Sequence, residues 1–204
     1  MMRSRIVVVP AVIACSAALV TMAQPQGLKQ SQSELKKRYA EMVERTSGPT
    51  DQHKSLKAFV GKFDQVSEVR MGSGDPMLTH SIAKGRWIMG ERFVKVDCES
   101  APDEELKGSR MLIYGYDPQA KRFTLLNLES MSLTALTLLG DYDAESKTFT
   151  FEGERGQTGG EKVPVRWVIK VRDDGALDQQ ILMKPPGTED FTQVVKIKYT
   201  PRSK

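Results

Sequence analysis

The sequence predicts a mainly β protein: an antiparallel meander of about ten strands closed into a barrel, preceded by one or two helices. After Gly61, apolar and polar residues alternate almost to the end of the chain, which is the period of a strand with one buried face. Turn signals such as Asp117-Pro118 divide this region into short runs. The connections are too short for crossover helices, so successive strands must be antiparallel neighbours. Closure into a barrel removes exposed edges, and a sandwich is the alternative.

The first 23 residues predict a secretory signal peptide. Arg3 and Arg5 precede a long apolar run that ends in a small-x-small exit at Ala23. Cleavage after Ala23 predicts a secreted or periplasmic protein. Two alternatives stay open: a lipoprotein, because Cys15 ends a stretch that resembles a lipobox, and an uncleaved anchor.

Residues 24–50 are expected to form a tether and an N-terminal helix, and residues 51–204 the barrel domain. Ser31-x-x-Glu34 has the spacing of a capping box, and apolar residues then recur on one helical face. A second, short helix is expected before Gly61, where the helical period gives way to alternation.

The alternating runs predict the strands of the barrel, and the first run is expected to pair with the last. These runs are 62–71, 77–89, 91–99, 110–117, 122–130, 132–139, 148–154, 163–172, 177–183 and 191–200.

Composition narrows the classes of protein. With 204 residues and 39% hydrophobic content, the chain is long enough for one globular domain with its own core. Removal of the signal lowers the formal charge from +4 to +2, and the remaining basic residues are interspersed with acids, so no nucleic-acid partner is expected. Membrane contact is expected only if Cys15 is lipidated. Cys98 is then the one cysteine of the exported chain, which excludes an internal disulfide and favours a buried thiol.

Catalytic patterns are weak in this sequence. The two histidines, His53 and His80, have no close-spaced partners of metal-ligand type, so neither a metal nor a cofactor is predicted. A haem-binding barrel, which would need one of these two histidines as axial ligand, stays open as a minor alternative. No serine stands in a Gly-x-Ser-x-Gly elbow. Paired carboxylates such as Asp97 and Glu99 fall on the polar face of their strand. An enzyme is therefore the weakest of the functional hypotheses.

Polar residues in otherwise apolar rows are the more informative pattern. Arg92 begins the row that continues through Val94 and Val96, and other strands also carry polar side chains at apolar positions. In a packed core each unsatisfied polar group costs about 1 to 3 kcal/mol, whereas a cavity can hold water or the polar head of a ligand. The predicted ligand-binding residues are Arg92, Asn127, Glu129, Gln179, Gln193 and His80.

These rows predict a barrel that binds a small, largely apolar or amphipathic molecule in its interior. Inside a cavity, Arg92 would need either Glu129 or the anionic head of a ligand, such as a fatty-acid-like carboxylate. The alternative for both residues is a position at a strand end in water. The rival function is a filled barrel that acts as a partner-binding or envelope-associated structural protein.

Several short patterns occur in a characteristic order along the chain. They are His53-Lys54-x-Leu56, Gly90-Glu91-Arg92-Phe93, Gly115-Tyr116-Asp117, Gly140-Asp141-Tyr142 and Tyr199-Thr200-x-Arg202. Together they resemble the uncharacterised bacterial family catalogued as domain of unknown function number 1579, over roughly residues 51–202. The resemblance implies a lipocalin-like or calycin-like β-barrel, and it supplies no catalytic residues.

Overall fold

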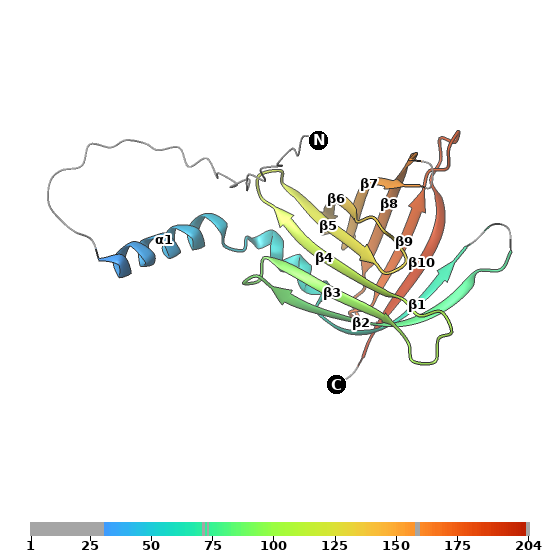
Figure 1. The fold of residues 1–204 in the computed structure, drawn as a ribbon, viewed down its shortest axis with the longest axis horizontal. Helices are drawn as coiled ribbons and strands as arrows, with labels where there is room; N and C mark the ends of the chain where they lie inside the picture. Colours follow the sequence, from blue (N-terminus) through green and yellow to red (C-terminus); the bar gives the residue numbers. More distant parts are fainter. Residues whose placement is uncertain (1–30, 71, 73, 158–159, 203–204) are drawn as a thin grey trace, which may run out of the picture. The chain divides into compact units, whose positions relative to one another are not determined.

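A computed structural model describes residues 31–70, 72, 74–157 and 160–202. Within these ranges, two helices precede ten antiparallel strands that close into a barrel (Figure 1). The elements are α1 (Gln32–Ser47), η1 (Asp51–Phe59), β1 (Gly61–Val69), β2 (Met77–Ile88), β3 (Phe93–Ser100), β4 (Ser109–Asp117), β5 (Arg122–Glu129), β6 (Leu136–Asp143), β7 (Thr148–Gly156), β8 (Lys162–Val171), β9 (Leu177–Met183) and β10 (Thr192–Pro201).

The barrel is a simple meander in which each strand pairs with its neighbours in sequence. Its two ends are joined by β1 and β10, which pair from Phe63 opposite Pro201 to Val69 opposite Val195. The prediction that the first and last strands close the sheet is therefore confirmed. Closure leaves the backbone of this long apolar sheet without an unpaired edge strand.

The described residues divide into two units, with the boundary between Met42 and Val43. In the first unit, the N–H of Ser31 donates to Oε2 of Glu34 at 3.1 Å, and the N–H of Glu34 donates to Oγ of Ser31 at 3.3 Å. The predicted capping box at the start of α1 is thus confirmed. The predicted signal peptide, with Cys15, lies outside the described residues. No helix among the described residues is both long and apolar enough to cross a membrane.

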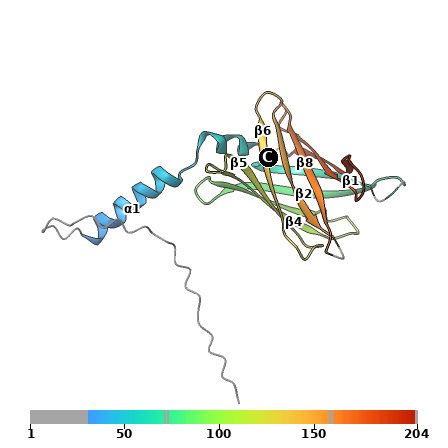
Figure 2. The same cartoon turned by 90° about the horizontal axis from the view of Figure 1, so that it is seen from above.

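Helix η1, a 3₁₀-helix, closes one end of the barrel, as Figure 2 shows from above. Its apolar residues Leu56 and Phe59 are buried, and η1 packs against β3 and β4. The Phe59 ring stacks on Tyr114, with centroids 3.9 Å apart. Gly85 on β2 allows the backbone of Phe59 to lie close to the sheet, because a Cβ at this position would lie 1.7 Å from the carbonyl oxygen of Phe59. Since η1 leads directly into β1, the plugged end is the end where β1 begins.

The strands show the predicted alternation of buried and outward side chains. On β8, for example, Val163, Val165, Trp167 and Ile169 are buried and the residues between them are not. Most strand boundaries lie within two residues of the prediction, and the largest difference is at β6. The run expected at 132–139 forms a strand only from Leu136, and Leu133 is fully exposed in the preceding loop. The short apolar pattern there did not distinguish a strand from a loop.

Candidate functional site

The end of the barrel opposite η1 contains a cavity of about 520 Å³. Its lining includes Met77 at the start of β2, Leu106 in the β3–β4 connection, Met131 in the β5–β6 connection and Arg155 near the end of β7. In an antiparallel meander alternate connections lie at the same end, so these residues lie around one opening. The barrel is therefore plugged by aromatic side chains at one end and hollow at the other.

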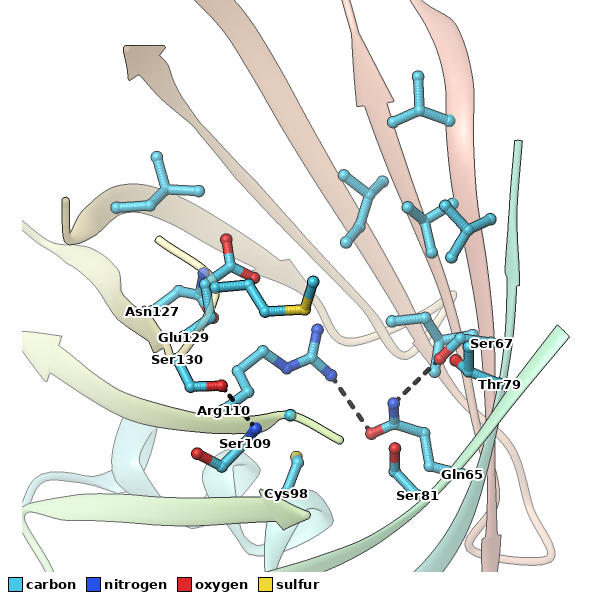
Figure 3. Close-up of a pocket in the computed structure, with 18 of the residues that line it drawn as sticks. Gln65, Ser67, Thr79, Ser81, Cys98, Ser109, Arg110, Asn127, Glu129 and Ser130 are labelled. Carbon is cyan, nitrogen blue, oxygen red and sulfur yellow. Dashed lines mark hydrogen bonds between the residues drawn. The ribbon is translucent and has the colours of Figure 1, made fainter. Parts of the chain in front are cut away.

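The cavity has two chemically different walls. One wall, from β8, β9 and β10, is apolar and includes Trp167, Ile181 and Val195. The other wall, from β1 to β5, is rich in hydroxyl and amide side chains, several of which are labelled in Figure 3. The polar side chains of this wall are Gln65, Ser67, Thr79, Ser81, Ser100, Ser109, Asn127 and Ser130. A molecule with an apolar body and polar groups on one side would complement this interior.

Arg110, the second residue of β4, extends into the cavity (Figure 3). Its Nη2 donates to Oε1 of Gln65 at 3.3 Å and to the phenolic oxygen of Tyr199 at 3.1 Å. Both acceptors are neutral, and no carboxylate of the described residues forms an ion pair with this guanidinium. An arginine cannot lose its proton to escape burial, so the site holds a positive charge that lacks a counter-charge.

Neutral hydrogen bonds fix the orientation of this guanidinium. Gln65, which accepts from Arg110, donates from Nε2 to Oγ of Ser67 at 3.0 Å. Tyr199 donates from its hydroxyl to Oε1 of Gln179 at 2.9 Å. These contacts join β4 to β1, β10 and β9 across the floor of the cavity. The charge is thus held in place before any ligand arrives.

Tyr199 and Cys98, two titratable side chains beside the Arg110 guanidinium, are neutral at physiological pH. Burial raises the pKa of the Tyr199 phenol, an effect that the positive charge of Arg110 opposes only in part. Burial likewise raises the pKa of the Cys98 thiol, which lines the cavity beside Arg110, again against the opposing effect of the guanidinium. Neither group supplies a negative charge to balance Arg110.

A second charged group lies nearer the rim. Glu129 stands opposite Arg110 in the β4–β5 register, but its carboxylate pairs with Arg155, whose Nη2 lies 3.1 Å away. Among the lining residues, two arginines therefore face one glutamate, which leaves a formal charge of +1. Anionic ligands are favoured by this balance.

Two buried carboxamides have an atom without a hydrogen-bond partner. Oδ1 of Asn127, whose residue is 3% exposed, is unpaired in the cavity wall. Nε2 of Gln179, which is fully buried, is unpaired beside a void of about 10 Å³ between the cavity and the aromatic plug. Buried polar atoms are nearly always hydrogen-bonded, so each exception needs a partner such as a water or a ligand.

A family model described as "Protein of unknown function (DUF1579)" matches residues 48–201, a range that includes η1 and all ten strands. The chain belongs to this family. Among solved structures, it is similar to the S-type phycobiliprotein lyase CPES from Guillardia theta, with a TM-score of 0.53 and 12% identity over 79% of this chain and 98% of that chain. Similarity at this identity shows a shared fold. No curated protein matches the chain.

In this DUF1579 protein, three of the six predicted site residues lie in or next to the cavity. Asn127 and Glu129 line it, and Gln179 lies directly beneath it. The other three, Arg92, His80 and Gln193, are not among the residues that line it. Nowhere in the described ranges do three or more His, Cys, Asp or Glu side chains gather as metal ligands.

Arg92 lies at the plugged end of the barrel, in the connection between β2 and β3. Its Nη2 is 3.3 Å from Oε2 of Glu44, and its Nη1 donates to the carbonyl oxygen of Met89 at 3.1 Å. The side chain is 26% exposed. Arg92 thus pairs with Glu44 and not with the predicted Glu129. Of the two positions expected for Arg92, a cavity wall and a strand end, the structure shows the strand end.

His80 and Gln193 were expected on inner faces, and both have the opposite orientation. His80 is exposed, with Nδ1 2.8 Å from Oε1 of Glu104, because it is Thr79 and Ser81 that face the cavity on β2. Gln193 is displaced by a bulge between it and Val195, which reverses the alternation along β10. The residue that sequence reasoning missed is Arg110, although it precedes the apolar row Leu112 and Tyr114 just as Arg92 precedes its own.

Proposed function

We propose that the protein binds a small amphipathic carboxylate inside the barrel. The carboxylate lies on the guanidinium of Arg110, and the apolar chain follows the wall formed by Trp167 and Ile181. The observation that carries the proposal is a positively charged side chain inside a cavity, without a carboxylate partner among the described residues. The likeness of the barrel to a phycobiliprotein lyase is compatible with binding of a small molecule.

The size and polarity of the site support this proposal over a filled barrel that acts through its outer surface. A volume of about 520 Å³ lies within the range of small-molecule sites. Each methylene buried against the apolar wall contributes about 0.8 kcal/mol to binding. A charge-assisted contact between the carboxylate and Arg110 adds specificity, because the guanidinium presents paired donors that match a carboxylate.

Ligand binding is tested by displacement of a fluorescent fatty acid from delipidated protein, with hexadecanoic acid and hexadecanol as competitors. Arg110→Met should weaken binding of the acid about 10- to 150-fold, the equivalent of about 1.5 to 3 kcal/mol for a hydrogen bond to a charged group. Binding of the alcohol, which has no charge, should change by less than about threefold.

Arg92→Met is the matched control, because it makes the same substitution at the plugged end. It should leave the affinity for both competitors unchanged, in contrast to the effect expected when Arg92 was placed in the interior. The absence of saturable binding by the unaltered protein would refute the proposal. An equal loss of acid and alcohol binding in Arg110→Met would refute the role of the guanidinium.

We further propose that the chain is exported and cleaved after Ala23, so that the mature protein begins at Gln24. The small-x-small exit and the basic residues before the apolar run motivate this proposal. The intact mass of protein recovered from its own host should equal that of residues 24–204. A mass that corresponds to a diacylated Cys15 would replace this proposal with the lipoprotein alternative.

A further inference from the structure

We infer that the ligand carries a second polar group, a hydroxyl or an amide two or three bonds from its carboxylate, and that Asn127 recognises this group. The inference rests on the proposed function, because it assumes that a carboxylate occupies Arg110. It adds a class of ligand: hydroxylated or amide-linked acyl carboxylates in place of plain fatty acids.

The first observation is the carboxamide of Asn127. This residue is 3% exposed and lines the cavity, and its Oδ1 has no hydrogen-bond partner. Its neighbours on the same face of β5, Phe123 and Leu125, are apolar and buried. A leucine would fill such a position without an unpaired polar atom. The amide therefore lowers the stability of the fold unless a group in the cavity forms a hydrogen bond with it.

The second observation is the place of Asn127 relative to Arg110. Asn127 stands opposite Leu112 in the β4–β5 register, and Arg110 is two residues before Leu112 on the same face of β4. The two polar residues are therefore diagonal neighbours on adjacent strands, at a spacing of about 7 to 8 Å between backbones. Figure 3 shows both side chains on the same side of the cavity. A group close to the carboxylate of a ligand on Arg110 can reach Asn127.

The third observation is the polar wall on this side of the cavity. Ser109 and Ser130, which hydrogen-bond each other beyond the Arg110–Glu129 pair, line the cavity on this side, and Ser67 and Thr79 continue the hydroxyl surface on β1 and β2. A saturated chain gains nothing from these side chains and would lie along the apolar wall. A ligand with a polar substituent on one side satisfies both walls together.

The chemistry of a carboxamide limits what the second group can be. The side chain of asparagine presents one acceptor oxygen and an NH₂ group with two donors. A hydroxyl or an amide both donates and accepts hydrogen bonds. Each of these groups can therefore pair with Asn127 whether the oxygen or the nitrogen of its carboxamide points to the ligand. A second carboxylate fits less well, because Glu129 already places a negative charge in the same wall. Two ligand types meet these requirements: a 3-hydroxy fatty acid and an N-acylglycine.

The test compares three competitors of similar length on the full-length protein: hexadecanoic acid, 3-hydroxyhexadecanoic acid and N-myristoylglycine. The unaltered protein should bind at least one of the two substituted acids about tenfold more tightly than hexadecanoic acid. Asn127→Leu should retain binding of hexadecanoic acid and reduce that preference to within about twofold.

Thr124→Val is the matched control, because it removes a polar side chain from the other face of the same strand, outside the cavity lining, and should keep the preference. The comparison of competitors on the unaltered protein needs no variant, so a folding defect in Asn127→Leu does not remove the test. Saturable binding of all three acids within about twofold would overturn the inference and leave the proposed function standing. No saturable binding of any acid would overturn the proposed function itself.

Discussion

Arg110 and Tyr199 contact each other across the floor of the barrel, with 3.1 Å between Nη2 of the arginine and the phenolic oxygen of the tyrosine. The same hydroxyl donates to the fully buried Gln179 at 2.9 Å. Tyr199 therefore supports both the charge of the site and the amide beneath it.

Tyr199→Phe should lower the free energy of unfolding by about 1 to 3 kcal/mol, because Gln179, with Nε2 already unpaired, would lose its remaining hydrogen bond. Urea denaturation measures this loss. Adding Gln179→Leu to the variant should restore part of it, since both polar partners are then gone. Tyr142→Phe, a matched change on a half-buried tyrosine, should cost less, and equal losses in the two variants would contradict the role given to Tyr199.

Phe59→Ala should destabilise the barrel strongly. The ring is buried, stacks on Tyr114 and lies 5.0 Å from the ring of Phe149, so its removal leaves a hole in the aromatic plug. Truncation of a buried phenylalanine to alanine costs about 3 to 5 kcal/mol. Lys57→Ala, on the exposed side of the same helix, is the control and should cost less than about 1 kcal/mol. A similar midpoint of unfolding for both variants would show that η1 is not part of the core.

His53 should make the stability depend on pH. Burial, with a smaller contribution from the charge of Arg92, lowers the pKa of this imidazole below its ordinary value of 6.5, and its Nδ1 accepts from the N–H of Thr50. As the pH falls through the ordinary value, the unfolded chain takes up a proton that the folded chain resists. The free energy of unfolding should therefore decrease between about pH 7 and pH 5.

To isolate the contribution of His53, the free energy of unfolding is measured against pH for the unaltered protein and for His53→Gln. The variant should have a flatter profile over that interval. Gln52→Ala, an exposed change without a titrating group on the same helix, is the control and should keep the slope of the unaltered protein. A steeper decline in His53→Gln would contradict a lowered pKa of His53 in the folded protein.

Cys98 should react slowly with thiol reagents while the protein is folded. The residue is buried in the cavity wall, and the raised pKa keeps its sulfur as a thiol instead of the reactive thiolate. With Cys15 replaced by serine, the rate of reaction with a chromogenic disulfide at pH 8 should rise about 100-fold or more in urea. Hexadecanoic acid should slow the reaction of the folded protein further. A fast reaction without urea would show that the cavity floor opens readily.

The barrel could be predicted because its pattern is simple. Each strand buries one face, the turns carry glycine, proline or aspartate, and consecutive strands pair, so the chain order is also the strand order. The prediction of which side chains face inward was wrong where the alternation of apolar and polar residues is weak. On β2 the inward residues include Thr79 and Ser81, which are polar, while the outward Leu78 is apolar and exposed. An apolar row no longer marks the interior where the interior itself is a polar cavity wall.

Strand direction determines which of the two arginines, Arg92 or Arg110, lies at the hollow end of the barrel. Both arginines begin an apolar row, but β3 starts at the plugged end and β4 at the hollow end, because strand direction alternates in a meander. The plug precedes β1, so odd-numbered strands start beside it and even-numbered strands end there. The element order alone therefore places Arg110 at the hollow end. It also places Asn127, near the end of β5, at the same level.

The aromatic plug also determines the order of events during binding. With η1 filling one end, a ligand that uses the cavity passes the rim near Met77 and Met131 in both directions. Its carboxylate has to travel ahead of the hydrocarbon to reach Arg110, and on release the charged group is the last to leave. The trailing end of the chain therefore remains closest to the rim throughout. Any acceptor, whether a second protein or a lipid surface, meets the hydrocarbon terminus first, so transfer would begin with an exchange of apolar contacts.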